Sequence, residues 1–211
     1  ELLAGDDRAL VERVAARTPA LPVRTVDGVT MLAPAQRFAD KRNVENPELY
    51  PVFPFRRVTL ASEPELHAQA VAALEARADR GTSGWRQDGL FHAVLGLAEG
   101  AREHLVARAS QHDPTQRFPA FWGPNYDWTP DQTHGGVLVR ELQLMLLQAD
   151  GDAIHLLPAW PTDWDVDAKL HAPGRTIVRV RVVEGELVSL DVEPPERLAD
   201  VVVHGPYEAP R

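Results

Sequence analysis

The sequence predicts an α+β chain in which the helices come first and the strands last. Up to about residue 149, apolar side chains recur at helical spacing. In 176–183, apolar residues alternate with Arg, which is the period of two expected of a half-exposed strand. Because the pattern changes near Gly151, we expect two regions, a helical one in 1–150 and a small antiparallel, β-sandwich-like domain in 151–211.

The helical region begins with a helix that Asp6 or Asp7 can cap, with Leu10, Val11, Val14 and Ala15 as its apolar face. Asp27-Gly28 between two short apolar runs predicts a type I′ hairpin. Ser62-Glu63-Pro64-Glu65 is typical of a capping box that starts the next helix. We further expect a long helix over 86–109 and a deeply buried one over 137–149.

Four short strands are expected after the helices, at 154–157, 176–183, 187–192 and 201–203. Glu184-Gly185 is expected to turn the second of these strands into the third. We expect Trp160 and Trp164 to pack the helical region against the strands.

Composition excludes several functions. The net charge of −9 and the pI near 5.3 argue against nucleic acid as a partner, because phosphate binding needs a basic surface. With no Cys, disulfides and thiolate chemistry are excluded. No apolar run nears the roughly 20 residues of a membrane span, and we expect no cofactor or metal. The start at Glu1, with no signal peptide, suggests a fragment of a longer chain.

The loop over 121–136 combines aromatic, acidic, amide and Gly residues. Aromatic rings bind the C–H faces of sugars, carboxylates and amides bind their hydroxyls, and glycoside hydrolysis needs two carboxyl groups. We therefore expect a sugar site with these candidates: Trp122, Asn125, Asp127, Trp128, Asp131 and His134. The alternative is a rigid loop that plugs the core, with its aspartates capping turns.

Asp131 is the candidate catalytic residue. It precedes the predicted buried helix, and a helix N-terminus favours an ionised carboxylate, which suits a general base. A simple N-cap would look the same in the sequence. His134 fits a sugar-hydroxyl ligand or a structural residue.

Two earlier loops supply further candidates. In 43–51, Glu45, Asn46 and Glu48 are expected to bind substrate, although Glu in a Pro-containing loop often serves solubility alone. In 81–88, Trp85 is a candidate sugar platform, and its alternative role is a packing anchor. Asp88 fits a first-turn residue that complements the helix dipole.

The order of these segments resembles glycoside hydrolase family 95, the α-L-fucosidase family. The resemblance rests on four segments, namely Leu49–Pro54, Thr82–Trp85, Asp131–Gln148 and Ile154–Ala159. It implies that the chain is the C-terminal part of an inverting (α/α)₆ barrel, a partial toroid of helical hairpins, followed by a β-domain. In the family, a His-rich segment that contacts the sugar precedes the Tyr-Pro loop, and residues 43–48 replace that segment here. The resemblance therefore implies a six-hairpin glycosidase that acts on a sugar other than fucose, such as one of a plant or algal polysaccharide.

By this resemblance Asp131 is the general base that activates water. The family's general acid lies in an earlier half of the barrel, so the resemblance implies that the chain alone is inactive. Its partners would be an oligosaccharide or polysaccharide and the N-terminal part of the same enzyme, in a secreted or periplasmic setting. The alternatives are a non-catalytic carbohydrate-binding or structural module, and a polysaccharide lyase on a similar toroid.

Overall fold

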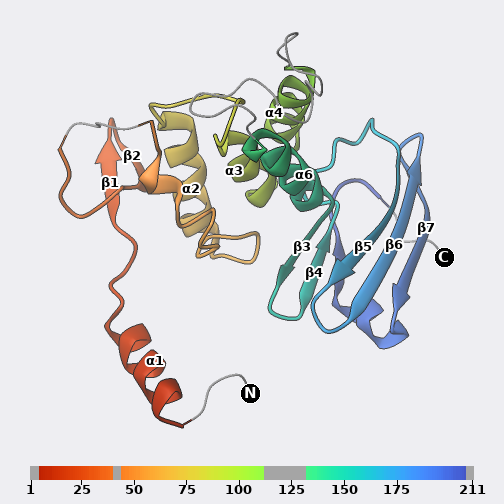
Figure 1. The fold of residues 1–211 in the computed structure, drawn as a ribbon, viewed down its shortest axis with the longest axis horizontal. Coiled ribbons are helices and arrows are strands. Elements are labelled where there is room, and N and C mark those ends of the chain that lie inside the picture. The colour runs from red at the N-terminus through yellow and green to blue at the C-terminus, as the bar shows by residue number, and fades with distance from the viewer. Residues whose placement is uncertain (1–4, 40–43, 112–131, 208–211) are drawn as a thin grey trace.

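The computed structural model describes residues 5–39, 44–111 and 132–207 and confirms the α+β class. The helical region consists of the following elements: α1 (Gly5–Arg17), β1 (Val23–Val26), β2 (Val29–Leu32), η1 (Pro47–Leu49), α2 (Pro64–Ala76), α3 (Asp88–Val94), α4 (Ala98–Ser110) and α6 (Thr133–Leu146). The strand region that follows contains β3 (Leu147–Asp150), β4 (Ala153–Leu156), β5 (Val166–Ala172), β6 (Thr176–Val183), β7 (Glu186–Glu193), η2 (Pro195–Asp200) and β8 (Val201–Val203). Figure 1 shows the helical region beside the two small sheets that these strands form.

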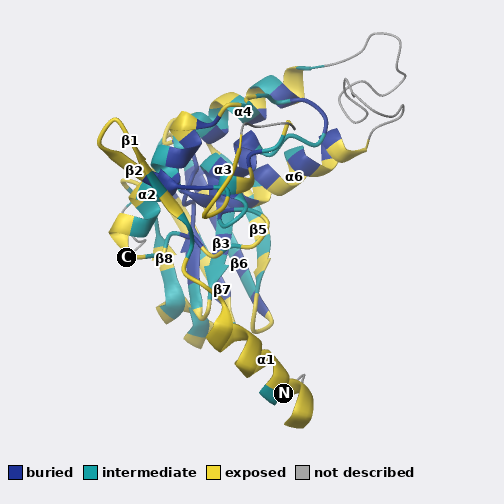
Figure 2. Cartoon of the chain, turned by 90° about the vertical axis from the view of Figure 1, so that its left-hand side faces the viewer, coloured by how far each residue is buried: buried dark blue, intermediate teal, exposed yellow. Residues whose placement is uncertain are grey.

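The first helix, α1, forms where the sequence predicts it, but it has no buried residue. Its expected apolar face is open, with Leu10 51%, Val11 52% and Val14 59% exposed. Figures 1 and 2 show α1 standing away from the helical region. The amphipathic pattern therefore predicts the helix correctly, whereas its apolar face meets no partner among the described residues.

The hairpin of β1 and β2 confirms the turn prediction. Val26 pairs with Val29, and the two residues between them, Asp27 and Gly28, have φ values of 51° and 81°. A type I′ turn requires positive φ at both positions. The hairpin ends in the buried residues Met31 and Leu32, so it is fixed to the core at this end.

The predicted capping box before α2 is wrong. Glu63 is the N-cap residue and makes no side-chain cap bond, while Pro64 occupies the first helical turn. The Ser62 hydroxyl instead accepts a hydrogen bond from the backbone N–H of Thr59 at 2.9 Å. Pro at the start of a helix needs no capping partner for its nitrogen and already has a helical φ, which explains how α2 begins without the box.

The long helix expected over 86–109 is two helices, α3 and α4. Gly96 has a φ of 73°, and the left-handed conformation at this position ends α3. The Leu97 N–H donates to His92 O at 2.9 Å and the Gly96 N–H to Ala93 O at 3.1 Å, the two bonds of a Schellman motif. The sequence signal for this break is the single glycine.

The last predicted helix begins and ends earlier than expected. It covers Thr133–Leu146, and the chain then passes without a loop into β3. β3 pairs antiparallel with β4, but β4 pairs in parallel with β8, so the prediction of an antiparallel domain is wrong for this sheet. The first strand of the C-terminal sheets thus lies before residue 151, while the division into 1–150 and 151–211 stays a prediction.

The second sheet has the strand order β5-β6-β7 and is antiparallel. Its centre confirms the alternation seen in the sequence, because Val178, Val180 and Val182 are 0–2% exposed. Glu184 and Gly185 form the expected turn, with φ values of 51° and 80°. β5 was not predicted.

One hydrophobic core joins the helices to the sheets and includes buried residues of α3, α6, β4 and β6. Figure 2 shows these buried segments between more exposed surfaces. Trp160 and Trp164 pack edge to face with ring centroids 5.4 Å apart. Arg102 of α4 lies over Trp164 at 5.4 Å, so this pair connects a helix to the segment before β5 as expected. No helix in the described ranges is long and apolar enough to span a membrane.

Candidate functional site

Two of the loops that the sequence points to meet at one small hollow in the helical region. The hollow has a volume of about 90 Å³ and is lined by Val44, Glu45, Asn46, Tyr50, Trp85, Arg86, Gln87, Asp88 and Phe91. The first four come from the segment around η1, and the others from the entry to α3 and its first turns. The structure therefore brings together Glu45, Asn46 and Trp85, which were predicted from separate loops.

Glu45 contributes a carboxylate to this hollow. The Tyr50 hydroxyl donates to its Oε2 at 2.6 Å. Burial, followed by this hydrogen bond and the negative charge of Glu45, raises the pKa of Tyr50 to about 12. The protonated Tyr50 hydroxyl fixes one oxygen of Glu45, which leaves the other oxygen able to accept from a ligand hydroxyl.

Asn46 holds the loop in place. It is 7% exposed, its amide donates to Asp79 O at 3.0 Å, and its carbonyl accepts from Asp79 N at 3.4 Å. This clasp joins the η1 segment to the chain after α2. Glu48 lies in the first turn of η1 and does not line the hollow.

Asp88 forms a buried ion pair with Arg77. The Arg77 Nε to Asp88 Oδ1 distance is 2.6 Å, and the two side chains are only 5% and 3% exposed. Arg77 is the C-cap of α2, where its guanidinium also donates to Leu74 O, and Asp88 lies in the first turn of α3. Both charges complement their helix dipoles. Asp88 lies in the first turn of α3, as predicted, and its side chain lines the hollow.

A second hollow adjoins the first through Trp85 and Gln87, which line both. It has a volume of about 290 Å³ and is lined by Phe53, Trp85, Gln87, Leu90, Thr133, Gly136, Val137 and Arg140. Most of this lining is apolar, with an amide and a guanidinium at its borders. An aromatic ring between an apolar hollow and a polar one suits a ring-shaped ligand that has C–H faces and hydroxyl edges.

His134 lies apart from both hollows. It is 0% exposed, its Nε2 is 2.9 Å from Arg108 O, and its Nδ1 is 3.4 Å from Arg108 Nη1. These contacts tie the start of α6 to α4. The sugar-binding role remains a prediction, and the observed partners correspond to the structural alternative.

The remaining candidates lie outside the described residues. They are Trp122, Asn125, Asp127, Trp128 and Asp131. The described chain resumes at Gln132, the N-cap residue of α6. Thr133, two positions after Asp131 in the sequence, lines the second hollow.

A buried carboxyl group between α6 and α3 was not predicted. Glu141 of α6 is 0% exposed, and neither of its side-chain oxygens has a hydrogen-bond partner in the described part of the chain. A Cβ atom at position 89 of α3 would clash with the Glu141 carboxyl group, so the approach of Glu141 to α3 requires glycine at that position. Burial raises the pKa of Glu141 to about 8, the nearby Arg108 charge opposes the rise, and the Asp88 charge adds to it.

Sequence reasoning also missed Tyr50, Gln87 and Arg140. Tyr50 and Gln87 lie within loops that the sequence singles out, but a Tyr before a proline and a Gln between an Arg and an Asp give no separate signal. Two histidines that the sequence does not single out, His67 and His104, are half-buried. His67 Nε2 is 3.1 Å from Leu95 O, and burial lowers the pKa of His104 to about 4.

In comparisons with known proteins, neither a family model nor a curated protein matches the chain. Within the ranges 5–39, 44–111 and 132–207, no group of three His, Cys, Asp or Glu could hold a metal ion.

Proposed function

We propose that this chain is the sugar-binding and base-bearing part of an inverting glycoside hydrolase built on an (α/α)₆ toroid. In this proposal Asp131 is the general base, and the two hollows that share Trp85 bind sugar rings. The observation that carries it is the meeting of Glu45, Asn46 and Trp85 at one hollow, because carboxylate, amide and aromatic side chains from two separate loops are the kinds of group that bind sugars.

The division of chemistry between the hollows supports the proposal. Glu45 and Gln87 present oxygen and amide groups to the first hollow, and Phe53, Leu90 and Val137 give the second an apolar wall. Sugars need both kinds of contact. The chain enters α6 at the second hollow through Thr133, so the segment that contains Asp131 joins the described structure beside the proposed binding site.

The described hollows do not hold two free carboxyl groups. Asp88 is paired with Arg77, which leaves Glu45 as the carboxylate able to accept from a ligand. Inversion requires an acid and a base about 6.5–9.5 Å apart with water between them. We therefore place the general acid on further polypeptide of the same enzyme. The apolar face of α1 is exposed, and exposed apolar faces mark association surfaces. This supports the proposal that further polypeptide covers the helix.

The test is hydrolysis of aryl glycosides and plant or algal oligosaccharides by the full-length protein, with Asp131→Asn beside it. We expect the substitution to lower kcat by about 10²-fold or more, because general-base catalysis contributes on that order. Asp27→Asn is the matched control, since Asn also tolerates the positive φ of the hairpin turn. The control is expected to keep the activity of the wild type.

Three other outcomes would oppose this proposal. Equal activity of Asp131→Asn and wild type would place the base elsewhere. Sugar binding without turnover on any substrate would favour the non-catalytic carbohydrate-binding module. Turnover that yields an unsaturated sugar would favour the lyase.

A further inference from the structure

A third hollow lies where the helical region meets the sheets, and the proposed catalytic chemistry does not use it. It has a volume of about 440 Å³ and is lined by Arg56, Arg140, Gln143, Leu144, Leu147, Gln148, Ala149, Lys169, Leu170, His171 and Pro173. These residues come from the turn before α2, from α6, from β3, and from β5 and the segment after it. A volume of several hundred Å³ is ordinary for a small-molecule site.

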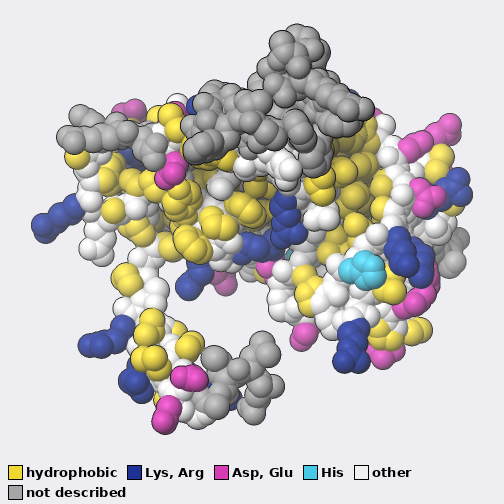
Figure 3. All heavy atoms as spheres, in the orientation of Figure 1, with side chains coloured by type: hydrophobic (Ala, Val, Ile, Leu, Met, Phe, Trp, Pro, Cys, Tyr) yellow, Lys and Arg dark blue, Asp and Glu magenta, His cyan; other side chains and the backbone are white. Residues whose placement is uncertain are grey.

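Every ionisable side chain that lines this hollow is cationic or a histidine. Arg56, Arg140, Lys169 and His171 line it, and no Asp or Glu does. The whole chain carries a net charge of −9, so the local sign is opposite to the global one. Figure 3 shows Lys and Arg side chains on this face where the helices meet the sheet, with a His beside them on the sheet. A concave surface of one charge sign concentrates ligands of the other.

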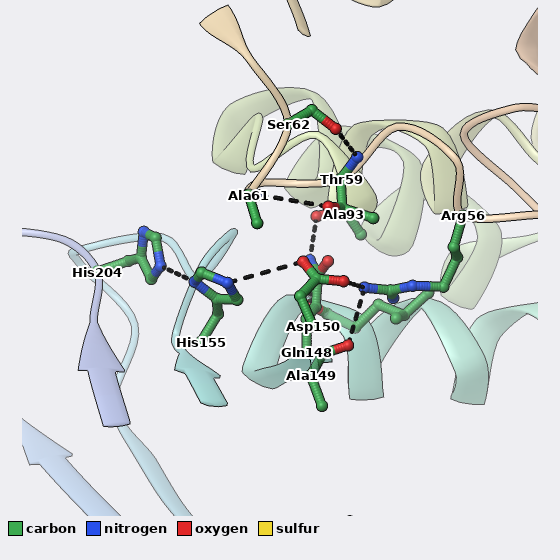
Figure 4. A network of polar contacts seen from close by, with 11 residues as sticks. Arg56, Thr59, Ala61, Ser62, Ala93, Gln148, Ala149, Asp150, His155 and His204 are labelled. Atoms are coloured by element: carbon green, nitrogen blue, oxygen red, sulfur yellow. Dashed lines mark hydrogen bonds and ion pairs between the residues drawn. The ribbon is translucent and has the colours of Figure 1, made fainter. Parts of the chain in front are cut away.

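The charge of Arg56 is already balanced within the protein. Its Nη2 lies 3.2 Å from Asp150 Oδ1, and Asp150 Oδ2 is 3.7 Å from Nε2 of His155. His155 is in turn hydrogen-bonded to His204, with Nδ1 and Nε2 2.9 Å apart. Figure 4 shows this row from Arg56 through Asp150 to the two histidines. These contacts fix Arg56 at the hollow, and they engage both carboxylate oxygens of the neighbouring Asp150.

Arg140 and Lys169 have no such partner among the described residues. Neither takes part in an ion pair or a side-chain hydrogen bond there. Burial, followed by repulsion from Arg56, lowers the pKa of Arg140. Two guanidinium groups that face one hollow repel each other, and an anion bound between them would relieve that repulsion.

The third hollow is also linked to the proposed sugar site. Arg140 lines both the second and the third hollow, and Trp85 and Gln87 line both the second and the first. Shared side chains thus connect the three hollows in one series. Leu144, Leu147 and Leu170 add apolar side chains to the lining of the third hollow, which suits the C–H face of a sugar that carries a charged substituent.

We propose that this hollow binds the carboxylate or sulfate group of an acidic sugar, held by Arg140 and Lys169. This inference rests on the proposed function and deepens it, because it names acidic glycans as the substrate class. Arg140 supplies a planar pair of donors that matches a carboxylate or sulfate, and Lys169 supplies a point charge. Gln143 adds an amide group to the lining, whereas the amide nitrogen of the buried Gln148 already donates to Ala93 O and Leu144 O.

The test is calorimetric titration of the full-length protein with D-glucuronate, D-glucose and inorganic sulfate at low salt. We expect glucuronate to bind, glucose to bind at least about tenfold more weakly, and the affinity for glucuronate to fall with ionic strength. Arg140→Gln and Lys169→Gln should each weaken glucuronate binding by about tenfold or more, since charged hydrogen bonds are the strong ones. Arg181→Gln, exposed on β6, is the matched control and should bind like the wild type.

Unchanged glucuronate affinity in Arg140→Gln and Lys169→Gln would overturn the inference, as would equal binding of glucose and glucuronate. If inorganic sulfate binds as tightly as glucuronate, the hollow is a site for free anions and not a site for an acidic sugar. Asp131→Asn separates this inference from the catalytic proposal, because the variant should lose turnover and keep glucuronate binding. Circular dichroism of each variant shows that a lost affinity does not come from unfolding.

Discussion

Replacing Arg77 with Met is expected to lower the free energy of unfolding by about 3–5 kcal/mol, because one half of a buried ion pair is left without its partner. The Asp88 carboxylate would then remain 3% exposed with no cation at 2.6 Å. The substitution also removes the donor to Leu74 O at the end of α2. Urea unfolding followed by circular dichroism measures the difference.

Two variants make this result specific. Arg179→Met removes an ion-paired but exposed Arg of β6 and should cost far less, because surface ion pairs contribute little. The double variant Arg77→Met, Asp88→Leu should recover much of the loss, since it removes the unpaired charge as well. A loss in Arg77→Met no larger than that of Arg179→Met would contradict the account of this pair.

Replacing Glu141 with Gln is expected to flatten the pH dependence of stability between pH 4.5 and about 8. The pKa of Glu141 is raised from 4.5 to about 8, so the folded state keeps a proton that the unfolded chain has already lost in this window. The contribution is fully present below pH 4.5 and is lost as the pH rises toward 8. At about 1.4 kcal/mol per pH unit, the free energy of unfolding of the wild type should fall by about 3–5 kcal/mol across this window. The Glu141→Gln variant should not show this loss.

The difference between wild type and Glu141→Gln isolates this carboxyl from the histidines. The pKa values of His92, His104, His155 and His204 are lowered by burial, so their contribution is lost as the pH falls below about 6.5. This loss of stability at acid pH is expected in both the wild type and Glu141→Gln. Glu186→Gln, exposed at the start of β7, is the matched control. Parallel stability curves for wild type and Glu141→Gln from pH 6.5 to 8 would refute a buried, protonated Glu141.

Local chemistry made much of the fold predictable. Asp27-Gly28 and Glu184-Gly185 specify their turns through positive φ, and the Val alternation of β6 specifies its buried face. The errors occur where two local signals compete. The apolar run through 142–149 fits a helix or a strand, and pairing of β3 with β4 ends α6 at Leu146. At α2, Pro64 made the Ser62 cap unnecessary.

Three of the residues that line the candidate site could be predicted from the sequence, but their contacts could not. Loop composition identified Glu45, Asn46 and Trp85, but the clasp between Asn46 and Asp79 and the burial of His134 depend on contacts between distant segments. Glu141 was invisible for the same reason, because its burial depends on the absence of a side chain at Gly89 in another helix. The third hollow is likewise built from segments more than a hundred residues apart.

We propose that the full-length protein hydrolyses a glycosidic bond with inversion. Proton NMR of the sugar first released by the full-length protein tests it most directly, because the spectrum reports the anomeric configuration before mutarotation. We expect a product whose anomeric configuration is opposite to that of the bond cleaved, because water attacks from the face opposite the leaving group. A product of retained configuration, or an unsaturated product of elimination, would contradict it.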